Sequence, residues 1–493
     1  MLLGVPFLPL PLGFLAWGAF VPLLAALDAR LRKGSGRSLF GLGWACGFAF
    51  FLIGVHWIAL LSDVAITVPW LKYPAWILAA AYLALFTGLA VWVAGTLTRR
   101  AGMPLVASFP FGFLAVEEMR ASGEMGFPWF QPGYTQHAYA PLLQMASLGS
   151  VTLVTLWLLF LNVLLWRTFA GKARVRAAFG ALLMVALPWS WGERVLATAP
   201  SSAGPVIALV QGNIPGKIKW SGTHQSEILA SFLELSGRAV AHVPPPSILI
   251  WPETATGSYL RRQPDQALQV TAFASRTRVP VFSGYADYAF DATAKARYFN
   301  AAGLFPPDGA PGPAYAKRHL VPFGERMPFQ WLMPALGRIE LGQAEWTPGS
   351  HPVLFPSAAG PFSCLVCFEA IFPDLARTDV RHGARWLVNV TNDEWFGNSA
   401  ALYQHAAMAT FRAAECRVPL ARCANTGLTL VCDAYGRVVD KAPVFESTVI
   451  VTPLPAPGPP GAYLAFGDWP GFLSGIVVAL AGLVALTGRV RRA

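Results

Sequence analysis

The sequence predicts a multi-span α-helical membrane bundle followed by an extracytoplasmic α/β domain. Of its 493 residues, 55% are hydrophobic and 13% are charged, a more apolar balance than soluble globular chains usually have. Long stretches of the first 200 residues carry almost no charge, whereas residues 206–452 have the ordinary mixture of a water-soluble domain. In that second part, short β-prone runs alternate with amphipathic helical runs, a pattern typical of a layered α/β domain.

Seven apolar runs approach the roughly 20 residues that are needed to cross a bilayer. They lie near residues 12–29, 39–61, 74–98, 104–120, 144–167, 176–193 and 469–487. The first ten residues are apolar but contain two prolines and are too short to span alone. They form an interfacial segment, a reentrant piece or the remnant of a further helix, so the sequence allows seven or eight spans.

Basic residues gather in alternate loops between these runs, around Arg30–Arg37, Arg99–Arg100, Arg167–Arg176 and Arg489–Arg492. By the positive-inside rule, these loops face the cytoplasm. The α/β domain then lies on the opposite side of the membrane. A net charge of +11 alone is compatible with a nucleic-acid partner, but many of the cations cluster in short loops that orient a membrane protein, and that placement argues against one.

These features divide the chain into four expected parts. Residues 1–198 form the N-terminal helix bundle and residues 199–452 form the α/β domain. Residues 453–468 are a linker, because Pro453–Gly461 is rich in proline and glycine and is therefore stiff and turn-forming. Residues 469–493 form a C-terminal membrane helix with a basic cytoplasmic tail.

The α/β domain is expected to contain eight strands and three long helices. The expected strands are 206–210, 248–251, 279–282, 298–305, 363–366, 386–391, 428–432 and 449–452. The expected helices are 228–240, 265–278 and 402–416; in the first, apolar residues recur at helical spacing. A domain of about 250 residues can bury a full hydrophobic core.

A reactive cysteine is the first candidate for chemistry. The apolar run Phe362–Phe372 reads as a strand that ends at Cys367 and gives way to a helix-compatible segment. A thiol at such a strand end can be exposed and flanked by backbone N–H groups, so we interpret Cys367 as a nucleophile. A lone strand cysteine is more often a small buried hydrophobe, which is our interpretation of Cys364.

Two further polar positions follow strands. Glu253 comes after the strand 248–251, where Pro252 ends the strand, and a carboxylate there can act as a general base. The loop Tyr315–Glu325 brings Lys317 and Glu325 together. Singly, each is more often a solvated surface residue. Together with Cys367 they form the set that covalent acyl transfer requires: a nucleophile, a proton acceptor and a cation for the oxyanion.

A family resemblance rests on the order of these motifs. Trp-Pro-Glu253, then Lys317-x-His-Leu-Val-Pro-Phe-Gly-Glu325, then Cys367-Phe-Glu369 resemble the Glu–Lys–Cys triad of the nitrilase superfamily. The strand end Leu209–Pro215 followed by Trp220, the loop Asn392–Gly397 and the preceding helices resemble the bacterial apolipoprotein N-acyltransferases. This resemblance covers nearly the whole chain.

The resemblance implies a nitrilase-like αββα sandwich on a bundle of the bacterial inner membrane, with the catalytic domain on the periplasmic side. It implies that Cys367 takes an acyl chain from a phospholipid as a thioester and passes it to the N-terminal amine of a diacylglyceryl-cysteine apolipoprotein. Glu253 would be the base, Lys317 the oxyanion residue and Glu325 a supporting carboxylate. The residues that would line or order the pocket are Phe368, Glu369, Trp395 and Trp220. Phe368 stands where a tyrosine is common, which keeps the ring and removes a hydroxyl.

Other functions remain open at this point. A membrane-tethered amidase would use the same residues, and a non-catalytic lipid-binding module would need none of them. The pair Cys364 and Cys367 has Cys-x-x-Cys spacing, but no second pair exists and the motif lies within a strand, so we expect neither a metal nor a redox site. No Gly-rich phosphate loop is present, and no soluble cofactor is implied. We expect a monomer, and the sequence leaves any disulfide pairing open.

Overall fold

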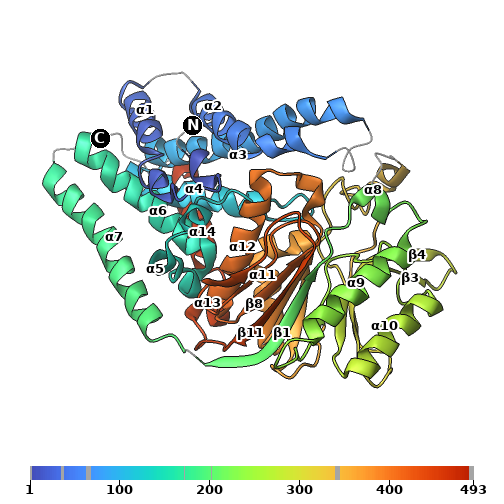
Figure 1. The fold of residues 1–493 in the computed structure, drawn as a ribbon. Helices are drawn as coiled ribbons and strands as arrows, with labels where there is room; N and C mark the ends of the chain where they lie inside the picture. The colour runs from blue at the N-terminus through green and yellow to red at the C-terminus, as the bar shows by residue number, and fades with distance from the viewer. Residues whose placement is uncertain are drawn as a thin grey trace. The chain divides into compact units, whose positions relative to one another are not determined.

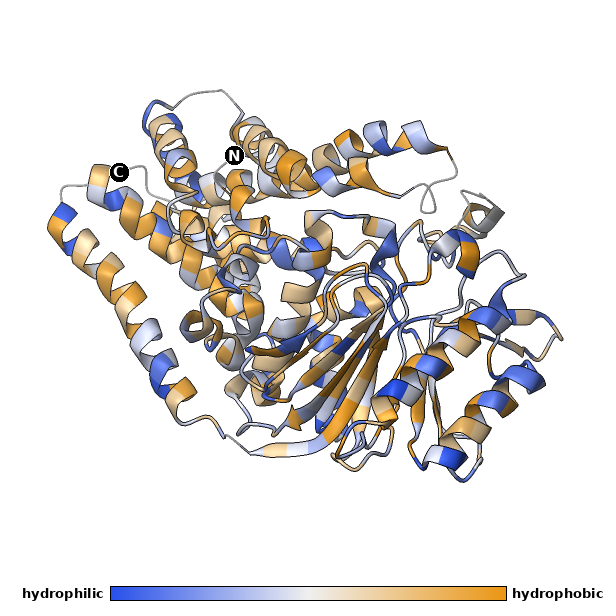
Figure 2. Cartoon of the chain, in the orientation of Figure 1, coloured by the Kyte–Doolittle hydropathy of each residue, from blue (hydrophilic) through white to orange (hydrophobic). Residues whose placement is uncertain are grey.

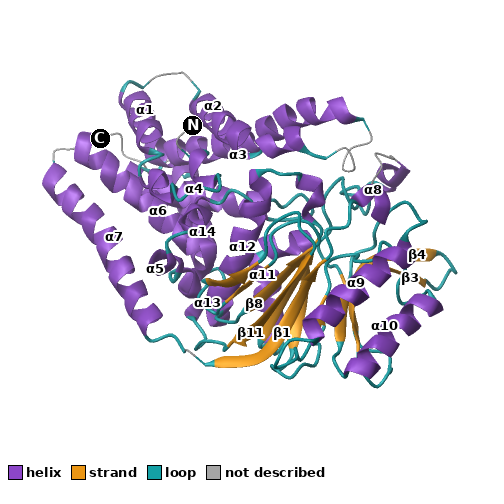
Figure 3. Ribbon diagram, viewed as in Figure 1, coloured by secondary structure: helices purple, strands orange, loops and turns teal. Residues whose placement is uncertain are grey.

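The computed structural model describes residues 3–34, 38–62, 68–170, 173–200, 202–338 and 345–487. The chain forms two compact units (Figure 1). The helical unit consists of Met1–Leu60, Trp70–Thr198 and Gly461–Ala493, and the α/β unit consists of Leu61–Pro69 and Ala199–Pro460. Every described strand belongs to the α/β unit, as the orange ribbons in Figure 3 show.

The helical unit contains long apolar helices and a few short ones. They are α1 Val21–Arg32, α2 Leu39–Gly54, α3 Lys72–Arg100, α4 Leu105–Ala121, α5 Ala140–Leu143, α6 Ala146–Ala170, α7 Arg174–Ala197, α13 Ala462–Phe466 and α14 Trp469–Leu486. Short 3-10 helices at Val5–Phe7 and Gly13–Trp17 precede α1. The first ten residues, as far as they are described, therefore hold a short turn of helix rather than a spanning one.

Six of the described helical segments are long and apolar enough to cross a membrane: Gly13–Arg32, Leu39–Leu60, Pro69–Arg100, Ala146–Ala170, Arg174–Ala197 and Trp469–Leu486. The predicted span near 104–120 is also a helix, α4, but it differs from the others. It has 17 residues, about 25 Å of helix, which is shorter than a hydrocarbon core of about 30 Å. Its last turn contains a buried ion pair between Glu117 and Arg120.

Close packing of α2 on α3 depends on two glycines. Gly43 and Gly47 are four residues apart and face Thr87 and Gly88 of α3. A Cβ on Gly43 would lie 2.6 Å from the Thr87 carbonyl oxygen, so only glycine fits there. Small residues at this spacing let helix backbones approach closely, which favours association in lipid, where the hydrophobic effect does not drive helices together.

The α/β unit contains two mixed sheets. The first has the order β11-β1-β2-β3-β4-β5 and the second β10-β9-β8-β7-β6. Their bounds are β1 Ala203–Gln211, β2 Leu249–Ile250, β3 Val281–Phe290, β4 Ala296–Phe305, β5 Ala314–Ala316, β6 Phe362–Val366, β7 Trp386–Thr391, β8 Leu420–Ala424, β9 Leu430–Cys432, β10 Val438–Lys441 and β11 Thr448–Pro455. Strands β1, β2 and β3 pair in parallel, as do β6, β7 and β8 up to the β6 edge of the second sheet, and the other neighbouring pairs are antiparallel.

Four layers result, because the sheets face each other and each carries helices on its outer side. Strand β1 contacts β8 and β4 contacts β6 across the interior. Helices α9 Gln225–Val240 and α10 Pro264–Thr277 cover the first sheet, and α11 Pro373–Arg381 and α12 Ala400–Cys416 cover the second. Figure 2 shows apolar strands at the centre and mixed colouring along α9 and α10. The nitrilase-like αββα sandwich that the resemblance implied is confirmed.

Packing of α9 on the first sheet supports Trp251, two residues before the candidate base Glu253. Phe232 packs against Trp251 with ring centroids 5.1 Å apart, and the Trp251 indole donates to Ser236 Oγ at 2.9 Å. Both rings belong to one buried core cluster. The chain is therefore held firmly where β2 ends and Glu253 follows.

The sequence did not predict strands β5, β8 and β10. Strand β5 has three residues and β10 lies at a sheet edge with exposed side chains. Strand β8 is fully buried but contains Arg422, whose charge hides the strand in a hydrophobicity pattern. Strand β11 also runs through Pro453 to Pro455, into the expected linker, and α13 lies within the same expected linker. The prolines fit because β11 is an edge strand, where a missing N–H breaks no ladder.

Candidate active site

The three residues of the predicted triad each follow a strand end and meet in one buried cluster. Glu253 comes after β2, Lys317 directly after β5 and Cys367 directly after β6. Their exposed fractions are 5%, 1% and 8%. The Lys317 ammonium lies 3.8 Å from Glu253 Oε1. Glu253 and Lys317, which come from different loops of the chain, are thereby brought within reach of each other.

Glu253 is held by donors at both carboxylate oxygens. Asn300 Nδ2 donates to Oε1 at 2.7 Å, and the backbone N–H of Asn392 donates to Oε2 at 2.8 Å. Burial raises the pKa of Glu253, the Lys317 charge opposes that rise, and the Glu325 charge adds to it. The carboxyl is thus oriented and has a higher proton affinity than an exposed glutamate, as a general base requires.

Lys317 is shared between two carboxylates. Its ammonium donates to Glu325 Oε1 at 2.9 Å, and Glu325 Oε2 accepts from the Val321 N–H at 2.9 Å. Asn300 bridges the cluster, because its Nδ2 also lies 3.2 Å from Glu325 Oε1. Burial alone would lower the pKa of Lys317, but Glu325 and Glu253 outweigh burial and raise it, so the side chain stays a cation.

Cys367 lies at a bend whose backbone conformation is rare for residues other than glycine. Its φ is +49°, in the left-handed region, between the end of β6 and a 3-10 turn over Cys367–Ile371. Burial and the Glu253 charge raise the pKa of its thiol, and Lys317 opposes them. The thiol is therefore protonated at neutral pH and needs a base to become a nucleophile. Burial and carboxylates also raise the thiol pKa of Cys364, so the bend and the opposing Lys317 cation are what distinguish Cys367.

Glu369 ties the Cys367 bend to the Lys317 loop. Its fully buried carboxylate accepts from the Val366 N–H at 2.7 Å, the Arg318 N–H at 2.7 Å and the Tyr315 hydroxyl at 2.7 Å. The first donor ends β6 and the other two flank Lys317. The structure therefore places this predicted residue behind the reacting groups, where it orders two loops.

The three predicted aromatic residues have different surroundings. Phe368 is buried against His319 and Phe372. Trp220 is 43% exposed and Trp395 is 37% exposed, so both lie at the surface of the α/β unit. Exposed indole rings are suited to contact an apolar ligand that arrives from outside.

Residues that the sequence did not single out support Cys367 from behind. His405 Nε2 lies 3.0 Å from the Cys367 carbonyl oxygen, and Arg422 Nη2 lies 3.1 Å from His405 Nδ1 and donates to Asp393 Oδ2 at 2.6 Å. Burial and Arg422 lower the pKa of His405, so the ring is neutral. Because a carbonyl oxygen can only accept, His405 Nε2 carries a proton and donates it to the Cys367 carbonyl, while Nδ1 lies between Arg422 Nη2 and Asp393 Oδ1, the latter at 3.1 Å. An arginine within an apolar strand was the sequence signal for this support.

Cys367, Asp393 and His405 also bring potential metal ligands within 4.8 Å of one another. Asp393 is already bonded to Arg422 and to the Thr391 hydroxyl, and His405 Nε2 to a carbonyl oxygen. The Arg422 guanidinium supplies the positive charge that a metal ion would bring, so this set does not fit a metal. All six cysteines are free thiols.

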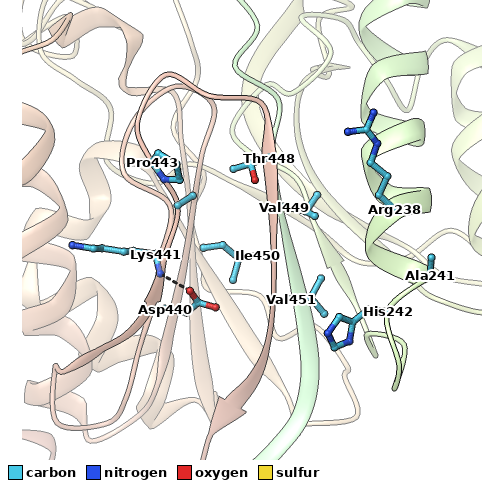
Figure 4. Close-up of a pocket in the computed structure, with 11 residues that line it drawn as sticks. Arg238, Ala241, His242, Asp440, Lys441, Pro443, Thr448, Val449, Ile450 and Val451 are labelled. Atoms are coloured by element: carbon cyan, nitrogen blue, oxygen red, sulfur yellow. Dashed lines mark hydrogen bonds between the residues drawn. The ribbon is translucent and has the colours of Figure 1, made fainter.

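A separate groove of the α/β unit opens where the two edge strands β10 and β11 face the end of α9 (Figure 4). Arg238 and His242 lie on its α9 side, and Asp440 and Lys441 on its β10 side. None of the predicted site residues lines it. The groove is therefore distinct from the cluster around Cys367.

Comparisons with known proteins match both units. Residues 1–164 match the family model "Apolipoprotein N-acyltransferase N-terminal domain" and residues 206–457 match "Carbon-nitrogen hydrolase". An apolipoprotein N-acyltransferase of Geobacter metallireducens is 35% identical over 88% of this chain and 84% of its own length. The apolipoprotein N-acyltransferase of Chlorobaculum tepidum is 31% identical over 100% of this chain and 95% of its own length. An amidase from Nesterenkonia sp. AN1 aligns with a TM-score of 0.39 at 17% identity, over 54% of this chain and 95% of that chain. The chain therefore belongs to the apolipoprotein N-acyltransferase family.

Proposed function

We propose that this membrane acyltransferase takes a fatty acyl chain from a phospholipid, holds it as a thioester on Cys367, and transfers it to the N-terminal α-amine of a diacylglyceryl-cysteine apolipoprotein. The observation that supports the residue assignment most strongly is the buried meeting of a thiol, an ammonium and an oriented carboxylate. Family membership supports the lipoprotein as acceptor.

In the first half-reaction, Glu253 accepts the thiol proton while the sulfur attacks the ester carbonyl of the phospholipid. Lys317, a buried cation beside Glu253, stabilises the negative charge that develops on the carbonyl oxygen of the ester. The carbon–oxygen bond of the ester then breaks, and the leaving oxygen takes the proton back from Glu253. The products are a lysophospholipid and a thioester, with no metal or nucleotide consumed.

In the second half-reaction, the α-amine of the apolipoprotein attacks the thioester carbonyl. Such an amine has a reference pKa of about 8, so a carboxylate with raised proton affinity can take its proton during attack. The carbon–sulfur bond breaks, and Glu253 returns the proton to the Cys367 sulfur. Glu325 supports both steps, because it holds Lys317 in place.

The proposal also assigns roles along the chain. Residues 1–198 and 469–493 anchor the protein in the bacterial inner membrane, residues 199–452 carry the chemistry on the periplasmic side, and residues 453–468 link them. The alternating basic loops support this orientation. We propose that the protein acts as a monomer, and that Phe368, Trp220 and Trp395 contact the lipid substrates.

The decisive experiment is an intact-mass measurement after purified protein is mixed with phospholipid vesicles. We expect a mass increase of one acyl chain, located on Cys367 by peptide mapping and released by neutral hydroxylamine. Cys367→Ala should lose the adduct, and Cys364→Ala, changed three residues earlier, should keep it. An adduct that persists in Cys367→Ala would disprove the nucleophile assignment.

The fate of the thioester separates acyl transfer from amide hydrolysis. Addition of a diacylglyceryl-cysteine peptide to the acylated protein should yield an N-acylated peptide faster than free fatty acid. Release of free fatty acid at the same rate with and without the peptide would favour the membrane-tethered amidase. A matched peptide with an acetylated amine should not accept the acyl chain.

A further inference from the structure

We propose that Lys219 is a second cation of the active site, a positioning residue that holds the Glu253 backbone and keeps the Glu253 carboxylate ionised. This inference deepens the proposed function and rests on it for the role of Glu253 as the base. The triad motif does not include Lys219. The sequence pattern singled out its neighbour Trp220 instead.

Lys219 is buried in a way that lysines seldom are. It ends the short helix α8 Gly216–Lys219, its exposed fraction is 0%, and its ammonium donates to the Glu253 carbonyl oxygen at 3.0 Å. Gly257 has φ +63°, and a Cβ there would lie 2.9 Å from Lys219 Cγ. The backbone around the lysine is thus shaped to take its side chain inward. Burying an ammonium is costly unless its charge serves a partner.

The balance of charge shows what Lys219 supplies. Two carboxylates, Glu253 and Glu325, compete for Lys317, whose ammonium lies 3.8 Å from the first and 2.9 Å from the second. Lys317 alone therefore favours Glu325. Lys219 adds a positive charge on the Glu253 side, and its field favours the ionised form of that carboxyl.

The charged groups that face these two residues come from several loops. Glu253 faces Lys317 and Glu325 from the loop after β5, Lys219 from α8, and the thiol of Cys367. Lys219 faces Glu253 and also Glu394, whose carboxylate accepts from the Gly216 N–H at 2.6 Å. Burial lowers the pKa of Lys219 to about 8 against the opposing effect of the two glutamates, so the lysine is mostly charged at neutral pH.

A test that needs no lipid measures how fast iodoacetamide alkylates Cys367 between pH 4 and 8, by peptide mass spectrometry. The rate should be level near neutral pH and fall at acid pH as Glu253 becomes protonated. In Glu253→Gln the rate should be low throughout and should follow the small thiolate fraction, with no level region. Lys219→Met removes the charge and raises the proton affinity of Glu253. It should therefore move the acid limb of the profile, the range in which the rate falls, by about one pH unit to higher pH. Lys217→Met is the matched control, because Lys217 lies on the same helix but is exposed; its profile should equal that of the unmodified protein.

Two more variants separate charge from packing. Lys219→Arg keeps the charge and should keep the position of the acid limb. Lys219→Gln keeps a donor without the charge and should move the limb to higher pH. If Lys219→Met does not fold, these two variants test whether the charge of Lys219 acts on Glu253. An acid limb that stays in place in Lys219→Gln, or that moves equally in Lys219→Arg, would overturn the inference. Alkylation does not depend on acyl transfer, so failure of the proposed lipid reaction leaves this test intact.

Discussion

Two buried charged clusters, one in each unit, use similar residues in different arrangements. In α4 of the helical unit, Arg120 donates to both carboxylate oxygens of Glu117, at 3.2 and 2.5 Å, and also to the Phe127 carbonyl. One cation meets one anion within a single helical turn. In the α/β unit, Lys317 is shared between Glu325 and Glu253, which come from different loops.

The difference teaches which buried charge can do chemistry. The Glu117–Arg120 pair is closed, because the two charges bond each other within one helical turn and Arg120 also bonds a backbone carbonyl. In the Lys317 cluster two carboxylates share one ammonium, Glu253 also faces Lys219, and a thiol lies beside them, so a proton can move within it. A buried ion pair alone therefore indicates little about function, whereas a shared one beside a nucleophile indicates an active site.

The largest expected effect comes from breaking the shared Lys317 cluster. Glu253→Gln keeps the shape of the side chain and removes the proton acceptor, so acylation of Cys367 should slow by roughly 10²–10⁴-fold. The rate of adduct formation by intact mass measures this, with Glu234→Gln, an exposed glutamate of α9, as the control. Acylation at an unchanged rate in Glu253→Gln would make the two clusters alike.

The closed pair should respond in stability and not in chemistry. Glu117→Leu leaves the Arg120 charge buried without its partner and should lower the free energy of unfolding by about 3–5 kcal/mol. The double variant Glu117→Leu/Arg120→Leu should recover most of that loss. Unfolding in detergent measures the first effect, and adduct formation per folded molecule should stay at the level of the unmodified protein in both variants. A slower acylation in the stable double variant would show that this pair also serves the reaction.

A medium effect is expected at the support behind Cys367. His405→Leu removes the donor to the Cys367 carbonyl, so the strained bend loses a restraint and adduct formation should slow by about tenfold. His405→Gln places an amide donor near the position of Nε2 and should restore much of the rate. The pH dependence of adduct formation in both variants should equal that of the unmodified protein, because the neutral imidazole donates to a carbonyl and takes no proton from the thiol. A lost acid limb in His405→Gln would instead identify His405 as the base.

The smallest effect concerns the pH dependence of stability at His319. Burial and the Lys317 charge lower its pKa to about 4, and its Nε2 has no hydrogen-bond partner among the described residues. Because an unfolded histidine titrates near 6.5, the folded state loses stability as pH falls from about 6.5 through 4. His319→Phe keeps the ring beside Phe372 and should make the protein about 1 kcal/mol more resistant to unfolding at pH 5 than the unmodified protein, relative to pH 7.5. An equal difference in the free energy of unfolding between the two proteins at both pH values would contradict this.

Much of the fold could be predicted because its signals are local. Helix α9 showed apolar residues at helical spacing, and the parallel strands β1, β6 and β7 showed continuous apolar runs. Strand β8 was missed because Arg422 interrupts its pattern, and that arginine is tolerated only through Asp393 and His405, which lie elsewhere in the chain. Helix α4 was expected to resemble the other spans, but its charged last turn shortens its apolar length.

The sequence by itself determined the two-part architecture, the strand ends at which Glu253 and Cys367 stand, and the order of Glu253, Lys317 and Cys367 along the chain, because hydropathy and periodicity depend on neighbouring residues. Only the tertiary structure decided that Asn300 bridges two carboxylates, that Lys219 turns inward to Glu253 while Trp220 stays exposed, and that His405 supports the Cys367 bend. The reason is that burial and charge pairing depend on which distant segments meet, and a one-dimensional pattern does not contain those distances.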